Sequence, residues 1–214
     1  MTDYDIMHFV VGPVMTNCYT IINKDTMECL VIDPGASGAA LYGKIKEAGA
    51  TVKAILATHA HFDHMGGVDD LIKASGYDIP IYIHEAEKAS LTDPDLNQAG
   101  MIGQYNAKYH ADIFLRDDEI IELAGFKIKV LFTPGHTPGG CCYYFENEGI
   151  VFCGDTLFNG SVGRTDFPGG SMSTLVRAIQ EKLYTLPDET QVYPGHNEPT
   201  TIGYEKTYNM FVNA

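Results

Sequence analysis

The sequence predicts a mixed α/β protein in which two mixed β-sheets pack face to face, with helices on the outside. Short apolar runs such as "AILA", "KVLF" and "IVFC" recur along the chain, and two packed sheets would bury them well. These runs alternate with hairpin turns and helical stretches in two roughly similar halves. No internal linker divides the 214 residues, so we expect one domain over residues 1–214.

The first half of the chain predicts strands and helices in alternation. The runs "FVVGPVMTNCYTII" and "CLVIDPGA" predict strands, and the Asp-Pro-Gly of Asp33–Gly35 predicts a turn after the second run. A helical stretch over 39–48 then leads to the strand-like "TVKAILATHA". A second helix should begin after Gly67, because "VDDLIKAS" places its apolar residues at helical spacing. The run "IPIYIHEAEKASL" predicts a strand followed by a helix.

The second half begins with a polar, glycine-containing segment, Asp93–His110, which predicts a surface loop with a short helix that could overhang a site. After it, "FKIKVLF" alternates as a half-buried strand does, and "GIVFCG" is a short apolar run that follows a turn. A helix over Ser173–Leu183, the strand-like "TQVYPGHN" and one last helix, "TIGYEKTYNMF", complete the expected elements.

Charge and cysteine usage exclude several classes of partner. The 28 acidic and 14 basic residues give a net charge of −14, which argues against nucleic acid because phosphate contacts need a basic face. No apolar run approaches the roughly 18 residues of a membrane span, and the N-terminus lacks the basic region of a signal peptide. The five cysteines lack metal-type spacing, so we expect buried free thiols in the cytoplasm, in a monomer or homodimer.

Residues suited to metal binding follow four of the apolar runs. The run "VKAILAT" leads into His59, His61, Asp63 and His64, while His136, Asp155 and His196 follow "KIKVLFTPG", "GIVFCG" and "TQVYPG". The ends of strands that share a direction converge at one edge of a sheet, where sites are commonly built. Five imidazoles and two carboxylates are too many ligands for one tetrahedral ion and about right for two.

The spacing inside the first of these runs indicates how its residues divide. His59 and His61, two positions apart in extended or irregular backbone, can point the same way. Asp63 and His64 follow after a bend and can face a second ion. The remaining histidines, His8, His84 and His110, stand alone, so we expect them to be ordinary surface or core residues. Of these three, His84 also follows a predicted strand, "IPIYI".

The stretches "THAHFDHMGG", "TPGHTPGG", "FCGDTLFNGSVGRTDFPGG" and "YPGHNEPTTIGYEK" resemble those of metallo-beta-lactamase fold hydrolases, and among them the short glyoxalase II-like (hydroxyacylglutathione hydrolase-like) proteins. The resemblance implies an αββα sandwich with two divalent metal ions at one edge, zinc in the first place, with iron or manganese as alternatives. By motif, one ion takes His59, His61 and His136, the other takes Asp63, His64 and His196, and Asp155 bridges them.

The resemblance also implies a reaction. A hydroxide held between the two ions would attack the carbonyl carbon of a small-molecule thioester, and the metal would stabilise the oxyanion that forms. Asp63 would be a catalytic residue as well as a ligand, because it can orient the hydroxide and accept a proton. Metal-binding histidines need an acceptor for their second ring nitrogen; Asp33 either serves as that acceptor or only caps its turn.

Two features depart from the long glyoxalase II pattern. Arg164 matches a cationic residue that grips glutathione, but Asp166 stands where an aromatic residue is usual. Arg164 therefore either binds substrate or pairs with Asp166 to hold the loop. The chain after His196 has room for one helix, so we expect no C-terminal helical glutathione-binding domain, and a broader or different thioester is plausible.

Other activities remain open on the same scaffold. A persulfide dioxygenase would use one Fe(II), here held by His59, His136 and Asp155, with O₂ as co-substrate. A lactonase, a phosphodiesterase or a metal protein without catalytic activity are further alternatives. The complete second ligand set favours the hydrolase.

Overall fold

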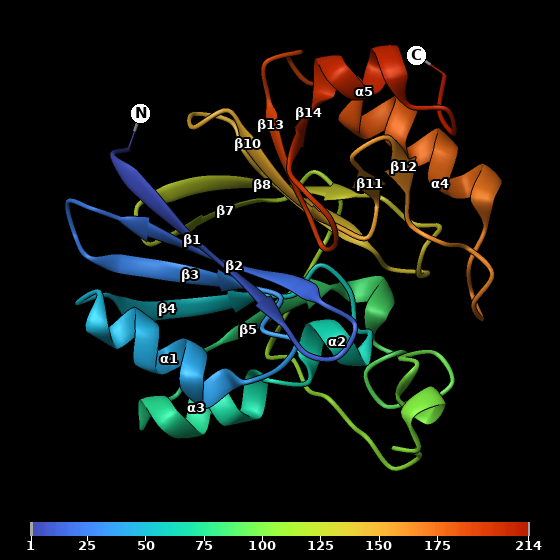
Figure 1. Cartoon of the computed structure of the whole chain (residues 1–214). Coiled ribbons are helices and arrows are strands. Elements are labelled where there is room, and N and C mark those ends of the chain that lie inside the picture. Colours follow the sequence, from blue (N-terminus) through green and yellow to red (C-terminus); the bar gives the residue numbers. More distant parts are fainter. Residues whose placement is uncertain (1, 214) are drawn as a thin grey trace.

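The structure, a computed structural model, describes residues 2–213 and has two six-stranded sheets that face each other (Figure 1). The first sheet has the order β1 (Tyr4–Val11), β2 (Thr16–Asn23), β3 (Glu28–Ile32), β4 (Thr51–Leu56), β5 (Ile81–His84), β6 (Ile113–Leu115). The second has the order β14 (Thr200–Thr201), β13 (Gln191–Pro194), β10 (Ile150–Gly154), β9 (Cys141–Phe145), β8 (Phe126–Phe132), β7 (Ile120–Leu123). A small hairpin pairs β11 (Leu157–Phe158) with β12 (Ser161–Val162).

The helices lie on the two outer faces of this pair of sheets. On the first sheet they are α1 (Gly38–Glu47) and α3 (Val68–Ser75), and on the second α4 (Met172–Ala178), its π-helical continuation η3 (Ile179–Leu183) and α5 (Ile202–Tyr208) (Figure 1). Short helices lie in connections: α2 (Phe62–Met65), η1 (Glu85–Glu87) and η2 (Ala99–Ile102). The predicted αββα sandwich is confirmed, and α1, α3 and α4–η3 lie close to their expected positions.

Three apolar cores hold the four layers together. The central core fills the space between the sheets and contains Tyr19, Phe126, Phe145 and Phe152 from both of them. Each outer helical layer has its own core, one against α1 and α3 and the other against α4, η3 and α5. Inner strands such as β2, β9 and β10 are buried along their whole length, which explains the continuous apolar runs in the sequence, while β8 alternates because one of its faces is partly exposed.

Strand direction brings the loops that follow four strands to one edge of the sandwich. In the first sheet β3, β4, β5 and β6 run parallel. In the second sheet β10 is parallel to β13, while β9 is antiparallel to both β8 and β10, so that β8, β10 and β13 share a direction. The residues that follow β4, β8, β10 and β13 are those expected to bind metal.

Two expectations about individual elements are wrong. The run "FVVGPVMTNCYTII" forms an antiparallel hairpin of two strands, in which Gly12 and Met15 of the turn have positive φ. After β5 the chain makes one 3₁₀ turn, η1, in place of the expected helix. A tertiary contact explains the second difference: a Cβ on Gly139 would lie 2.5 Å from the Glu87 nitrogen, so another loop packs tightly against this turn.

The cysteines and the helices agree with what the sequence predicts about disulfides and membrane spans. All five cysteines are buried and free of disulfide bonds, as predicted. Between residues 2 and 213, every helix is too short or too polar to cross a bilayer.

Candidate metal centre

The loop that follows β4 carries four of the predicted ligands into a tight turn. His59 and His61 precede α2, and Asp63 and His64 lie within it. The turn after β3 packs directly on this segment, because a Cβ on Gly35 would overlap the carbonyl oxygen of Asp63. Only glycine permits that approach, so the Asp-Pro-Gly turn helps to set the position of α2.

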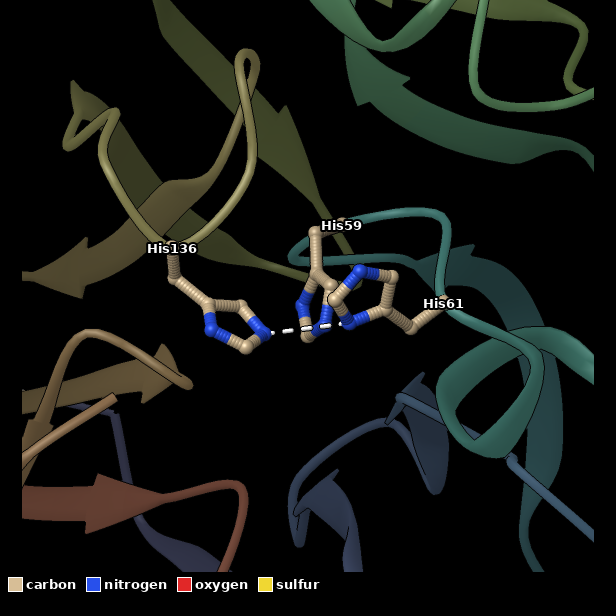
Figure 2. Close-up of side chains that lie close together, drawn as sticks. All are labelled: His59, His61 and His136. Carbon is tan, nitrogen blue, oxygen red and sulfur yellow. Dashed lines mark hydrogen bonds between the residues drawn. The ribbon is translucent and has the colours of Figure 1, made fainter. Parts of the chain in front are cut away.

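The first expected group contains three imidazoles from both sheets. Candidate ligand atoms of His59, His61 and His136 all lie within 4.8 Å of one another. Figure 2 shows the rings of His59 and His61, from the loop after β4, turned toward His136, which comes from the loop after β8. His61 Nδ1 and His136 Nε2 are 3.0 Å apart. Two ring nitrogens aimed at one point suit a shared cation.

The second expected group lies beside the first. Asp63, His64 and His196 also offer atoms within 4.8 Å of one another, and His196 Nε2 is 3.3 Å from Asp63 Oδ2. Asp155 lies between the two groups, with Oδ1 3.4 Å from His64 Nε2 and Oδ2 3.5 Å from His136 Nε2. The structure thus brings all seven predicted residues together, with Asp155 in the central position.

Further hydrogen bonds orient the imidazoles. Asp33 is buried and accepts from the Thr58 nitrogen at 2.8 Å, from the Thr58 hydroxyl at 2.7 Å and from His64 Nδ1 at 2.9 Å. His136 Nδ1 donates to the carbonyl oxygen of Arg164 at 2.6 Å. Each bond directs Nε2 of its histidine into the cluster, where a metal ion would take the place of a proton.

Two positioning residues were missed from the sequence. Glu87 is fully buried and accepts hydrogen bonds from the Ala60 nitrogen at 3.1 Å and the Gly139 nitrogen at 2.8 Å. It thereby joins the loop of His59 to the loop of His136. Thr16 donates to Asp63 Oδ2 at 2.6 Å. Neither had a signal in the sequence, since "HEAEK" is an ordinary polar stretch and Thr16 lies far from the other residues along the chain.

Unsatisfied polar atoms show that the residues fit a cation. Buried side-chain atoms of three cluster residues have no hydrogen-bond partner: His59 Nε2, His64 Nε2 and Asp155 Oδ1. Leaving such atoms unpaired costs about 1–3 kcal/mol each. All three residues belong to the cluster of metal-type ligands, where bound divalent ions would satisfy these atoms.

The electrostatics of the cluster keep two of its imidazoles neutral and favour a cation near its carboxylates. Burial lowers the pKa of His59 well below its usual value, and burial together with nearby His136 lowers the pKa of His61 to about 3. These rings are therefore neutral, the form that binds metal. Burial opposes protonation of His64 too, but the carboxylates of Asp63 and Asp33 outweigh it and raise its pKa. The charge that favours a proton there would equally favour a cation.

The three other histidines lie outside the cluster, as expected. His8 Nε2 is 2.8 Å from the side-chain oxygen of Asn17. The His84 ring stacks on Phe132 with 4.3 Å between centroids. His110 is exposed, with Nδ1 3.7 Å from Asp69 Oδ1.

A cavity of about 540 Å³ opens directly onto the cluster. Its walls include η2, which lies in the loop expected to overhang a site, and Arg164. The Arg164 guanidinium donates to both carboxylate oxygens of Asp166 at 2.8 Å. The ion pair considered from the sequence is therefore present, although Arg164 still lines the cavity.

Comparisons with known proteins agree with this geometry. The model of the metallo-beta-lactamase superfamily matches residues 11–196. A "probable metallo-hydrolase", YqgX of Bacillus subtilis, is 43% identical over 95% of both chains. A "hydroxyacylglutathione hydrolase", GloC of Haemophilus influenzae, is 36% identical over 92% of this chain and 93% of its own.

Solved structures of similar proteins also agree with this fold and site. A B3 metallo-beta-lactamase, BLEG-1, has a TM-score of 0.91 and 38% identity, covering 98% of this chain and all of its own. TTHA1623 in a di-iron-bound form has a TM-score of 0.84 and 35% identity, covering 96% of this chain and all of its own. ETHE1 from Myxococcus xanthus has a TM-score of 0.78 and 26% identity, covering 96% of this chain and 83% of its own. The side chains gathered at the edge of the sandwich can hold divalent metal ions, and the chain belongs to the metallo-beta-lactamase superfamily.

Proposed function

We propose that this protein hydrolyses a small-molecule thioester at a site for two divalent cations. His59, His61 and His136 would hold one ion, Asp63, His64 and His196 the other, and Asp155 would bridge them. The observation that carries the proposal is the convergence of these seven side chains in one cluster beneath a cavity that five of them line, with buried ligand atoms that lack a hydrogen-bond partner.

The reaction adds water across the thioester, so that a carbon–oxygen bond forms, the carbon–sulfur bond breaks, and an acid and a thiol are released. When bound, the metal ions supply Lewis acidity, which lowers the pKa of water and polarises the carbonyl group. Asp63 contributes by orienting the attacking water. Burial raises its pKa, but the charge on His64 and hydrogen bonds from His196 and Thr16 outweigh this and hold that pKa well below its usual range. Asp63 is thus a fixed anion that accepts a hydrogen bond.

Relatives support the reaction class and widen the choice of metal. GloC of Haemophilus influenzae carries the name of a thioester hydrolase, which favours this substrate class. Imidazole and carboxylate ligands accept zinc, iron and manganese alike, and the di-iron form of TTHA1623 makes iron a serious alternative to zinc. Buried unpaired thiols fit a reducing compartment, so we place the activity in the cytoplasm.

A persulfide dioxygenase with one iron is the second candidate. It would use His59, His136 and Asp155, of which the last two approach to 3.5 Å. The similarity to ETHE1 from Myxococcus xanthus leaves this candidate open.

Metal analysis beside two activity assays tests the proposal. The protein is purified without added metal, its metal content per chain is measured, and thiol release from an acyl-glutathione and from a neutral thioester is followed. We expect about two ions per chain and thioester turnover that a chelator abolishes. A single iron per chain, with oxygen consumption on glutathione persulfide and no thioester turnover, would favour the dioxygenase.

A further inference from the structure

The cavity above the metal centre has a largely apolar wall built from separate segments of the chain. Its apolar residues are Val14 in the turn after β1, Phe62 in α2, Met101 and Ile102 in η2, Phe158 and Val162 in the β11–β12 hairpin, and Phe167. Three of them are unusually exposed for apolar side chains: Met101 at 68%, Val14 at 47% and Ile102 at 46%. Contiguous exposed apolar side chains at a cavity mark a place where an apolar ligand binds.

The same cavity offers little to an anionic substrate apart from the metal ions. Among its lining residues in the described chain, Arg164 is the only arginine or lysine. Its guanidinium is bidentate with Asp166 and lies 4.0 Å from the centroid of the Phe167 ring. A substrate carboxylate would have to displace Asp166, which exchanges one ion pair for another and leaves Asp166 unpaired beside the newcomer.

The charge of the whole protein acts in the same direction. With a net charge of −14, its long-range field disfavours the approach of anions. Glutathione carries two carboxylates, whereas Arg164, the one arginine or lysine among the described lining residues, is already paired with Asp166.

We propose that the preferred substrate is an uncharged thioester with an apolar acyl chain, on a thiol carrier that lacks glutathione's carboxylates. The apolar wall formed by Met101, Ile102 and Val14 would receive the acyl chain, while the Arg164–Asp166 pair disfavours anionic carriers. This inference rests on the proposed thioester hydrolysis and specifies its substrate.

The first test compares two carriers with the metal-loaded protein. One hexanoyl group is presented on N-acetylcysteamine, which is neutral, and on glutathione, and kcat/KM is measured for each. We expect the neutral thioester to be favoured at least about fivefold. Equal or better turnover of the glutathione thioester would overturn the inference and leave hydrolysis intact. Failure of both thioesters would count against the proposed function itself.

The second test varies the acyl chain and the wall. From acetyl to hexanoyl on the neutral carrier, kcat/KM should rise about two- to fourfold per methylene, since each buried methylene contributes up to about 0.8 kcal/mol. The double variant Met101→Ser with Ile102→Ser should flatten this slope. Met210→Ser, which changes a methionine that is 87% exposed and outside the cavity, is the matched control. A slope that is flat in the unmodified protein contradicts the inference.

The third test releases the paired arginine. Asp166→Asn removes the partner of Arg164 and should raise kcat/KM for the glutathione thioester about two- to fivefold, the size expected of an exposed ion pair. The neutral thioester should be unaffected. An equal change for both carriers, or no change for either, would show that the ion pair does not select against anionic carriers.

Discussion

The cavity has two regions that differ in burial and chemistry: a floor, which is the cluster of seven ligand-type residues, and a rim, which is formed by Val14, Met101 and Ile102. On the floor, ligand side chains are buried and held by second hydrogen bonds, as His64 is by Asp33 and His136 by the carbonyl of Arg164. On the rim, Met101 and Val14 are exposed apolar side chains on connecting segments. The floor therefore specifies a chemistry through geometry, whereas the rim selects a substrate through its composition.

This difference predicts that changes on the floor alter metal binding and catalysis, while changes on the rim alter substrate choice. Floor residues depend on one another, because each ligand needs its orienting partner. Rim residues are nearly independent of the fold's stability, since they bury little area.

The largest effect should come from removing a ligand. His61→Ala should reduce thioester turnover by more than the roughly 10–100-fold expected for the loss of an outer partner. The protein should stay folded, because the side chain borders the cavity and its loss opens onto solvent. Steady-state kinetics and circular dichroism measure the two outcomes, with His110→Ala as the control. Unchanged turnover would show that the centre is misassigned.

Asp33→Asn should have the next largest effect. The amide cannot accept all three hydrogen bonds that the carboxylate accepts from Thr58 and His64. We expect metal affinity to fall about 10–100-fold, as measured by competition with a chelator. Asp69→Asn, an exposed acid on α3, should leave the affinity unchanged. If Asp33 only caps its turn, the apoprotein would lose stability while its metal affinity stayed the same.

Glu87→Gln tests the link between the two sheets. Its amide nitrogen would face one of the two backbone donors, Ala60 or Gly139, so one loop should lose its anchor. We expect metal affinity to fall about tenfold and the free energy of unfolding by about 1–3 kcal/mol. Glu148→Gln changes another buried glutamate, one that accepts from the Thr2 nitrogen, and should affect stability alone. Equal metal affinity in both variants would refute a positioning role for Glu87.

The smallest effect on the fold should come from the rim. Ile102→Ser should change the free energy of unfolding by no more than about 0.5 kcal/mol, measured by urea denaturation, and should leave the metal content unchanged. A large loss of stability or of metal content would mean that η2 supports the metal centre and does not act only in substrate choice.

Much of the centre could be predicted because ligand-type residues follow parallel-running strands. His59, His136, Asp155 and His196 each come after an apolar run, and the convergence of those strand ends is a general property of such sheets. Elements could be located where periodicity was strong, as in α3. The turn after β5 was missed because its shape depends on Gly139, which lies far away in sequence, and no local pattern encodes such a contact.

The sequence by itself determined the fold class and predicted that seven ligand-type residues would gather at one edge, because these depend on strand periodicity and on residue types with few other uses in such density. Their division between two ions, with Asp155 as the bridge, is what the family resemblance implies, and it stays a prediction. Only the tertiary structure decided which groups orient these residues. Glu87, Thr16 and the carbonyl of Arg164 act through contacts between distant segments. It also paired Arg164 with Asp166 above an apolar wall, since a side chain's partner depends on which surfaces the fold brings together.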